Sequence, residues 1–231
     1  MSRRLLYISV LLLLALPLLA QPRLRQPEMY VGLHGGVMAS TIQFSPTVPN
    51  MTPITKAVIL NGNGGFVFRY SGHKCCGLQV ELNYMQRGWR EQTEPAPYTR
   101  ALDYIELPFL AHIYFGSQTW RGFVNLGPQI GYCVHDSKAK EVANSGTLSH
   151  QYAAIDNRFD WGVTGGLGVY CRTKKAGLYQ LEARFGYSLG TIFASRTADY
   201  FNNANAMTLS LNLAWLWEIK PNKQRTTKEK L

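Results

Sequence analysis

Residues 207–217 read MTLSLNLAWLW and decide the fold. Every second residue from Met207 to Trp217 is large and apolar, and those between them, apart from Leu216, are small or polar. Successive side chains of a β-strand point to opposite faces of the sheet. The alternation therefore predicts a strand with one apolar face and one polar face.

The same alternation recurs along the rest of the chain. It is clear at 76–88, 102–115, 120–134 and 177–190, and weaker and rich in glycine at 29–41, 58–70 and 159–172. Together with 206–218, these segments make eight predicted strands. Each exceeds the roughly 9–11 residues that a tilted strand needs to cross a bilayer.

The connections between these strands alternate in length. Those at 71–75, 116–119 and 173–176 are tight, whereas those at 42–57, 89–101, 135–158 and 191–205 are long and polar. Short turns at one end and long loops at the other are typical of outer-membrane barrels. We therefore expect an all-β fold, an eight-stranded antiparallel up-and-down transmembrane β-barrel with a polar lumen, short periplasmic turns and four long extracellular loops.

The distribution of charge indicates which face of the strands meets lipid. Glu81, Glu106, Glu182 and Arg184 stand in mid-strand among Gln, Asn, Ser and Gly, while the opposite face carries hardly a charge. Charged residues make up only 16% of the chain, against about 25% in soluble domains. We expect the apolar face to contact lipid; the alternative is a soluble barrel with its apolar face inside.

Aromatic residues gather near the predicted strand ends, as in the girdles that anchor barrels at the headgroup level. The expected periplasmic girdle consists of Tyr70, Phe115, Trp120, Tyr179, Trp215 and Trp217. The expected outer girdle consists of Tyr132, Trp161 and Tyr187.

The N-terminus predicts export. Residues 1–20 combine two arginines with an apolar run that ends at Ala20, which is the pattern of a cleaved signal peptide. We expect a short periplasmic segment at 21–28, the barrel at 29–218 and a basic, disordered periplasmic tail at 219–231. The net charge of +10 does not indicate nucleic acid, because an exported chain does not meet it routinely. The expected location is the outer membrane of a Gram-negative bacterium, with outer-membrane lipid as a partner.

Several strands resemble one known family. The residues concerned are 104–110 (YIELPFL), 77–84 (GLQVELNY) followed by Gln86-Arg87-Gly88, Gly127-Pro128 before Gly131-Tyr132, 32–36 (GLHGG) and 160–162 (DWG). They are similar to the PorT-like outer-membrane β-barrel family over about residues 29–218. The resemblance implies an eight-stranded barrel in the outer membrane with no assigned enzymatic activity. The family's founding member assists type IX protein secretion.

The inward polar residues include acids and bases that could act together. Eight strands leave an interior just wide enough for side chains to fill, so a diffusion channel is not expected. Glu81 and Glu106 are expected at similar depth on adjacent strands, with Arg184 reaching them from the opposite wall. We predict a structural network there, because buried charges must be paired; a catalytic acid–base pair is the alternative.

No motif of a known catalytic, cofactor or metal site occurs, so we expect no cofactor and no metal. The four cysteines at 75, 76, 133 and 171 are expected as thiols, with a bridge between Cys75 or Cys76 and Cys171 as the alternative. Three functions remain: a non-enzymatic barrel that supports the envelope or binds a partner through its loops, an accessory component of type IX secretion, and a lipid-modifying enzyme. The expected partners are accordingly lipid and secretion-machinery or envelope proteins.

Overall fold

The computed structural model describes residues 23–46, 56–73, 75–91, 98–117, 119–138, 155, 157–173, 176–191 and 201–219. The predicted signal peptide at 1–20 and the residues after Ile219 lie outside this part of the chain. Within it, no helix has the length and hydrophobicity of a membrane span.

The described residues form nine β-strands. They are β1 (Arg23–Pro46), β2 (Lys56–Ala57), β3 (Ile59–His73), β4 (Cys76–Glu91), β5 (Tyr98–Gly116), β6 (Trp120–Lys138), β7 (Phe159–Thr173), β8 (Gly177–Ser188) and β9 (Phe201–Ile219). Only Val58 separates β2 from β3, and both pair with the same strand, β4. Together they therefore occupy one strand position, so that the nine strands fill the eight positions of the barrel wall. The predicted eight-stranded antiparallel barrel is therefore confirmed.

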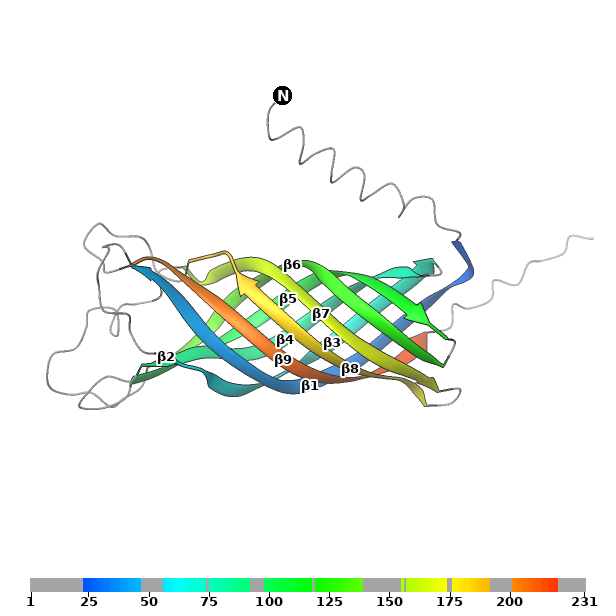
Figure 1. The fold of residues 1–231 in the computed structure, drawn as a ribbon, viewed down its shortest axis with the longest axis horizontal. Helices are drawn as coiled ribbons and strands as arrows, with labels where there is room; N and C mark the ends of the chain where they lie inside the picture. Colours follow the sequence, from blue (N-terminus) through cyan, green and yellow to red (C-terminus); the bar gives the residue numbers. More distant parts are fainter. Residues whose placement is uncertain are drawn as a thin grey trace, which may run out of the picture.

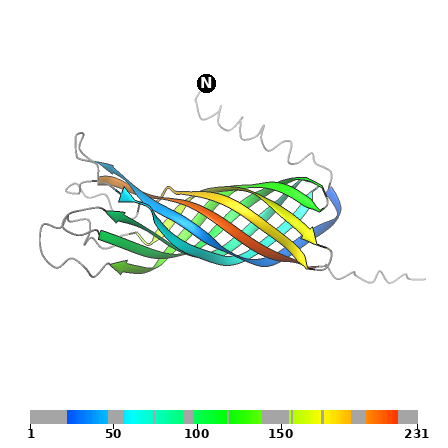
Figure 2. The same ribbon diagram turned by 60° about the horizontal axis from the view of Figure 1, so that its bottom comes forward.

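The sheet closes on itself (Figures 1 and 2). Its strand order is β4-β3-β1-β9-β8-β7-β6-β5, and β5 pairs with β4 to complete the ring. The first and last strands, β1 and β9, lie side by side from Met29 to Pro46. The start of β1 and the end of β9 share one end of the barrel with the short turns, which we call the short-turn end; the opposite end is the long-loop end.

Glycine shapes two of the short turns. Gly116 at the end of β5 and Gly177 at the start of β8 have φ angles of 120° and 89°. A side chain strains a backbone of this kind, and glycine does not. Both positions lie beside connections that were predicted to be tight.

Most strands extend further than predicted, mainly toward the long-loop end. β4 and β5 remain paired as far as Glu91 and Tyr98, and β6 continues to Lys138. The predicted loops at 89–101 and 135–158 are therefore too long, and β1 begins at Arg23, before the predicted residue 29. The reason is that the period-two pattern depends on one face meeting lipid, and it fades where a strand leaves the apolar band.

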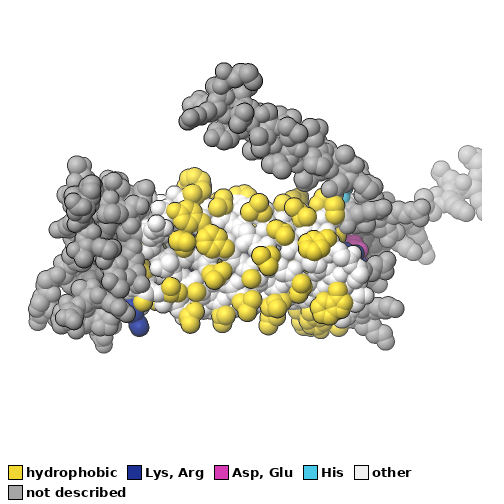
Figure 3. Space-filling view, viewed as in Figure 1, with side chains coloured by type: hydrophobic (Ala, Val, Ile, Leu, Met, Phe, Trp, Pro, Cys, Tyr) yellow, Lys and Arg dark blue, Asp and Glu magenta, His cyan; other side chains and the backbone are white. Residues whose placement is uncertain are grey.

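The wall is apolar outside and its centre is polar inside. Leu213 is 66% exposed on the outer face, whereas its neighbour Asn212 is 2% exposed in the lumen. On the face shown in Figure 3, hydrophobic side chains cover the barrel, and the visible charged side chains lie near its two ends. This is the polarity that the alternating strands predicted.

The lumen is not polar throughout, however, because an apolar cluster fills it toward each end. The cluster near the long-loop end contains Met38, Ile42, Met85, Trp89, Leu102, Tyr104, Cys133 and Ala206. The cluster near the short-turn end contains Tyr30, Val67, Tyr114, Phe123, Tyr170, Leu178, Ala214 and Leu216. The polar network occupies the level between them.

Candidate functional site: a charged network in the lumen

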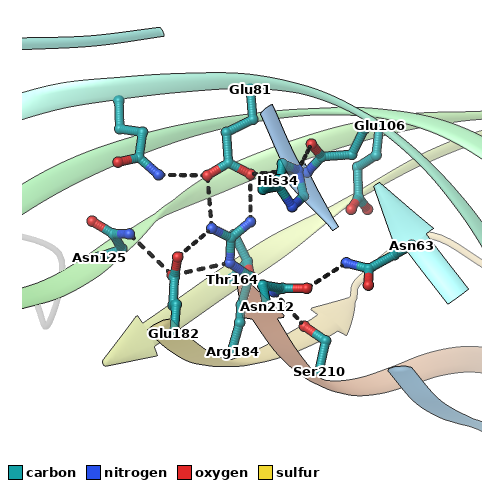
Figure 4. A network of polar contacts seen from close by, with 12 residues as sticks. His34, Asn63, Glu81, Glu106, Asn125, Thr164, Glu182, Arg184, Ser210 and Asn212 are labelled. Carbon is teal, nitrogen blue, oxygen red and sulfur yellow. Dashed lines mark hydrogen bonds and ion pairs between the residues drawn. The ribbon is translucent and has the colours of Figure 1, made fainter. Parts of the chain in front are cut away.

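Arg184 of β8 joins two glutamates at the centre of the lumen (Figure 4). Its Nη1 and Nη2 donate to the two oxygens of Glu81 on β4, at 2.5 and 2.7 Å. Its Nε and Nη2 also donate to Glu182, at 3.1 and 2.9 Å. The paired planar geometry is the one in which arginine binds carboxylates most strongly.

Amide side chains complete the coordination of both carboxylates. Gln79 and Asn83 donate to Glu81 at 2.5 and 3.0 Å. Gln180 and Asn125 donate to Glu182, each at 3.0 Å. Burial of a charge is tolerable only when it is paired and its remaining lone pairs are hydrogen-bonded, and both glutamates meet that condition.

A second arginine extends the network toward the short-turn end. Arg69 donates from Nε to Gln79 at 2.7 Å, and from Nη2 to Gln180. Its guanidinium also lies over the rings of Phe123 and Tyr170, at 5.8 and 5.5 Å from their centroids. With Arg69 and Arg184 against Glu81 and Glu182, this central network has balanced formal charge.

Two histidines border the central network. His34 Nε2 lies 2.6 Å from Oδ1 of Asn83 and 3.8 Å from Glu81. His112 Nδ1 lies 2.7 Å from Oδ1 of Asn125, whose amide nitrogen donates to Glu182. An amide oxygen only accepts, so His112 carries its proton on Nδ1.

Glu106 does not join Arg184, which corrects the predicted network. In the register of β4 and β5, Glu106 pairs with Asn83, so it lies nearer the long-loop end than Glu81. There it accepts a hydrogen bond from Arg87, which also donates to Asp160 of β7 at 2.7 Å. Asp160 in turn accepts from Ser188, and Arg87 lies 4.9 Å from the ring centroid of Tyr104. The lumen therefore contains two arginine-centred networks.

Further ion pairs lie near each end of the barrel. Arg100, fully buried on β5, donates to both carboxylate oxygens of Asp136 on β6, at 3.0 and 2.7 Å. Arg172 near the short-turn end bridges Glu28 of β1 and Glu218 of β9, at 2.8 and 3.0 Å. The sequence predicted neither pair, because Asp136 falls in the predicted loop at 135–158 and Glu28 in the predicted periplasmic segment at 21–28.

The predicted girdle residues all face outward. Tyr70, Phe115, Trp120, Trp215 and Trp217 lie near the short-turn end, and Tyr132, Trp161 and Tyr187 lie nearer the long-loop end. Trp215 stacks on Tyr179 with the ring planes 2° apart and also contacts Trp217, at a centroid distance of 4.2 Å.

The acidic side chains at the centre of the lumen are paired with arginines. Each of its four central acids, Glu81, Glu106, Asp160 and Glu182, is held by an arginine. Among the described residues, no three His, Cys, Asp or Glu side chains are grouped so that they could hold a metal ion. None of the four cysteines forms a disulfide.

A closed antiparallel barrel with an apolar outer wall is the structure that defines the class of outer-membrane β-barrel proteins. The family described as "Outer membrane protein beta-barrel domain" matches residues 19–194, most of the chain, and the protein belongs to that family. It is therefore located in the cell outer membrane.

The solved structures to which this chain is similar are distant in sequence. Outer membrane protein OprG from Pseudomonas aeruginosa is 10% identical with a TM-score of 0.53, covering 82% of this chain and 96% of OprG. AlkL, solved in lipid bilayers, is 11% identical with a TM-score of 0.47 and coverages of 86% and 94%. Outer membrane protein W of E. coli is 12% identical with a TM-score of 0.44 and coverages of 84% and 100%. Among functionally curated proteins, none matches the sequence.

Proposed function

We propose that this protein is a closed, non-enzymatic barrel that supports the envelope by binding a partner through the loops of its long-loop end. The occluded lumen is the observation that carries the proposal. Two apolar clusters and the charged networks between them fill the interior along its length. A solute has no route through such a barrel, so interaction is left to its ends and outer wall.

The long-loop end is the better candidate for partner binding. Its connections are the longest in the chain, and loops that join the strands of such a scaffold commonly carry binding function. The orientation expected from export, with both termini in the periplasm, directs these loops to the cell exterior.

The lumen favours a non-enzymatic role over a lipid-modifying one. A general acid or base needs a carboxyl group within reach of substrate. Glu81 and Glu182 are instead buried and bound by Arg184, Gln79, Asn83, Gln180 and Asn125. Loss of a lipid modification on deletion of the gene would contradict this assignment.

Loop replacement tests the proposal. We expect gene deletion to sensitise cells to detergent, and the wild-type gene to restore resistance. A variant with residues 139–154 replaced by a short Gly-Ser linker should insert normally but fail to restore it. Full restoration by this variant would exclude that loop as the functional element. The purified wild-type barrel should also give no conductance steps in a planar bilayer.

An accessory role in type IX secretion is the second candidate. It is supported by the resemblance of the strand motifs at 77–84 and 104–110 to PorT-like barrels. In this case deletion should abolish secretion of type IX cargo, whereas normal secretion in the deletion strain would remove the candidate.

A further inference from the structure

The outer wall carries a groove near the short-turn end, across neighbouring strands β6, β7, β8, β9 and β1. Its volume is about 560 Å³, and its lining is mainly apolar, including Leu33, Trp120, Val169, Tyr179, Leu213 and Trp215. Gly35 of β1 also lines it and has no side chain to occupy the space. A groove on this wall faces lipid, because the wall is the apolar face of a membrane barrel.

Trp215, at the aromatic edge of the groove, is held in place by two contacts. Trp215 stacks on Tyr179 with ring centroids 6.1 Å apart, and its indole Nε1 donates to the backbone oxygen of Ala176 at 2.7 Å. The only polar atom of the Trp215 side chain is therefore satisfied within the protein. The surface that remains suits a hydrocarbon chain.

The short-turn end is also basic. Its sequence carries Lys74 and Lys174-Lys175 in the tight connections and five basic residues after Ile219. Among the described residues at this end, Arg121 and Arg172 balance the acids Glu28 and Glu218, which are both paired with Arg172, so the excess of positive charge comes from these lysines and the C-terminal basic residues. Clustered cations beside a membrane attract anionic headgroups.

We propose that the groove holds one acyl chain of an anionic phospholipid from the leaflet at the short-turn end. The volume is about 19 times the roughly 30 Å³ that one water occupies in the liquid. That is room for a chain of methylene groups. The positive charge of this end favours a headgroup with net negative charge.

Lipid retention tests the proposal on the full chain. The protein is isolated from outer membranes in mild detergent and equilibrated with equal amounts of phosphatidylglycerol and phosphatidylcholine. Native mass spectrometry then counts the phospholipids that remain bound. We expect one phosphatidylglycerol per barrel, retained several-fold more than phosphatidylcholine.

Filling the groove provides the decisive variant. A Cβ at Gly35 would make an ordinary contact with its nearest neighbour, the oxygen of Asn63, at 3.7 Å, so the backbone accepts a side chain there and Gly35→Leu occupies the groove. Gly62→Leu is the matched control, since Gly62 faces outward on β3 outside the groove, with 3.9 Å to its nearest neighbour. Both variants should show the heat-modifiable gel mobility of a folded barrel.

The expected result is several-fold loss of bound phosphatidylglycerol in Gly35→Leu and unchanged retention in Gly62→Leu. Wild-type retention in Gly35→Leu would overturn the proposal, as would equal loss in both variants. Equal retention of the two phospholipids by the wild-type protein would also overturn it, because the proposal requires an anionic headgroup.

Discussion

Arg184 and Glu81 face each other across the full width of the barrel. β8 lies four strands from β4 in either direction around the ring, so these residues come from opposite walls. Two hydrogen bonds, of 2.5 and 2.7 Å, join them. The pair therefore braces opposite walls, which the hydrogen bonds between neighbouring strands cannot do.

Replacing Arg184 by leucine should destabilise the folded barrel strongly. The change leaves Glu81 and Glu182 buried without their cation, and breaking a buried ion pair in this way costs about 3–5 kcal/mol. The urea midpoint of unfolding in detergent should fall accordingly. The double variant Arg184→Leu with Glu81→Leu keeps the central charges balanced and should lose less; an unchanged midpoint in the single variant would reject the brace.

The separate network of Arg87 can be detected by energetic coupling. A double-mutant cycle with Arg87→Leu and Glu106→Gln should give a large interaction energy, of about 1–3 kcal/mol, because the two residues are in direct contact. The cycle between Arg184→Leu and Glu106→Gln should give a clearly smaller value. Equal coupling in the two cycles, measured by unfolding in urea, would support the single network that the sequence predicted.

Gly166→Ala should disturb the central network from the neighbouring strand. A Cβ at this position would lie 2.3 Å from Oε1 of Glu182, which Arg184 and Asn125 hold in place. Overpacking of this kind costs about 1–3 kcal/mol, seen as a lower urea midpoint. Gly165→Ala is the control, because its Cβ would meet the end of the lipid-facing Leu126 side chain at 3.3 Å; a similar loss in both variants would contradict the argument.

Two tryptophan substitutions compare the packing of the lumen with that of the outer wall. Trp89 is fully buried in the apolar cluster near the long-loop end, whereas Trp120 is 61% exposed on the lipid-facing wall. Trp89→Ala should cost about 3–5 kcal/mol by opening a cavity. Lipid can occupy the space vacated by Trp120→Ala, so that variant should unfold at a midpoint closer to wild type; the reverse order would mean that the cluster around Trp89 is not packed.

The sequence predicted the barrel and its polarity well, because alternation is a local property. In residues 207–217, each side chain is assigned to the lipid or to the lumen by its position alone. The same reasoning placed Glu81, Glu182 and Arg184 inside on the correct strands. It also placed Arg184 opposite Glu81, since eight strands in sequential order fix which walls face each other.

The register between strands and the closure of the barrel decided which charged residues pair in the lumen. Glu106 and Glu81 both point inward, but the register of β4 and β5 shifts Glu106 toward the long-loop end, to the level of Arg87 and Asp160. The apolar cluster near the long-loop end was equally hidden, because Trp89 fell in the predicted loop at 89–101. The sequence by itself thus determined which side of the wall each residue faces. Only the tertiary structure decided which residues meet, because hydrogen bonds and packing depend on the stagger between strands, which alternation does not encode.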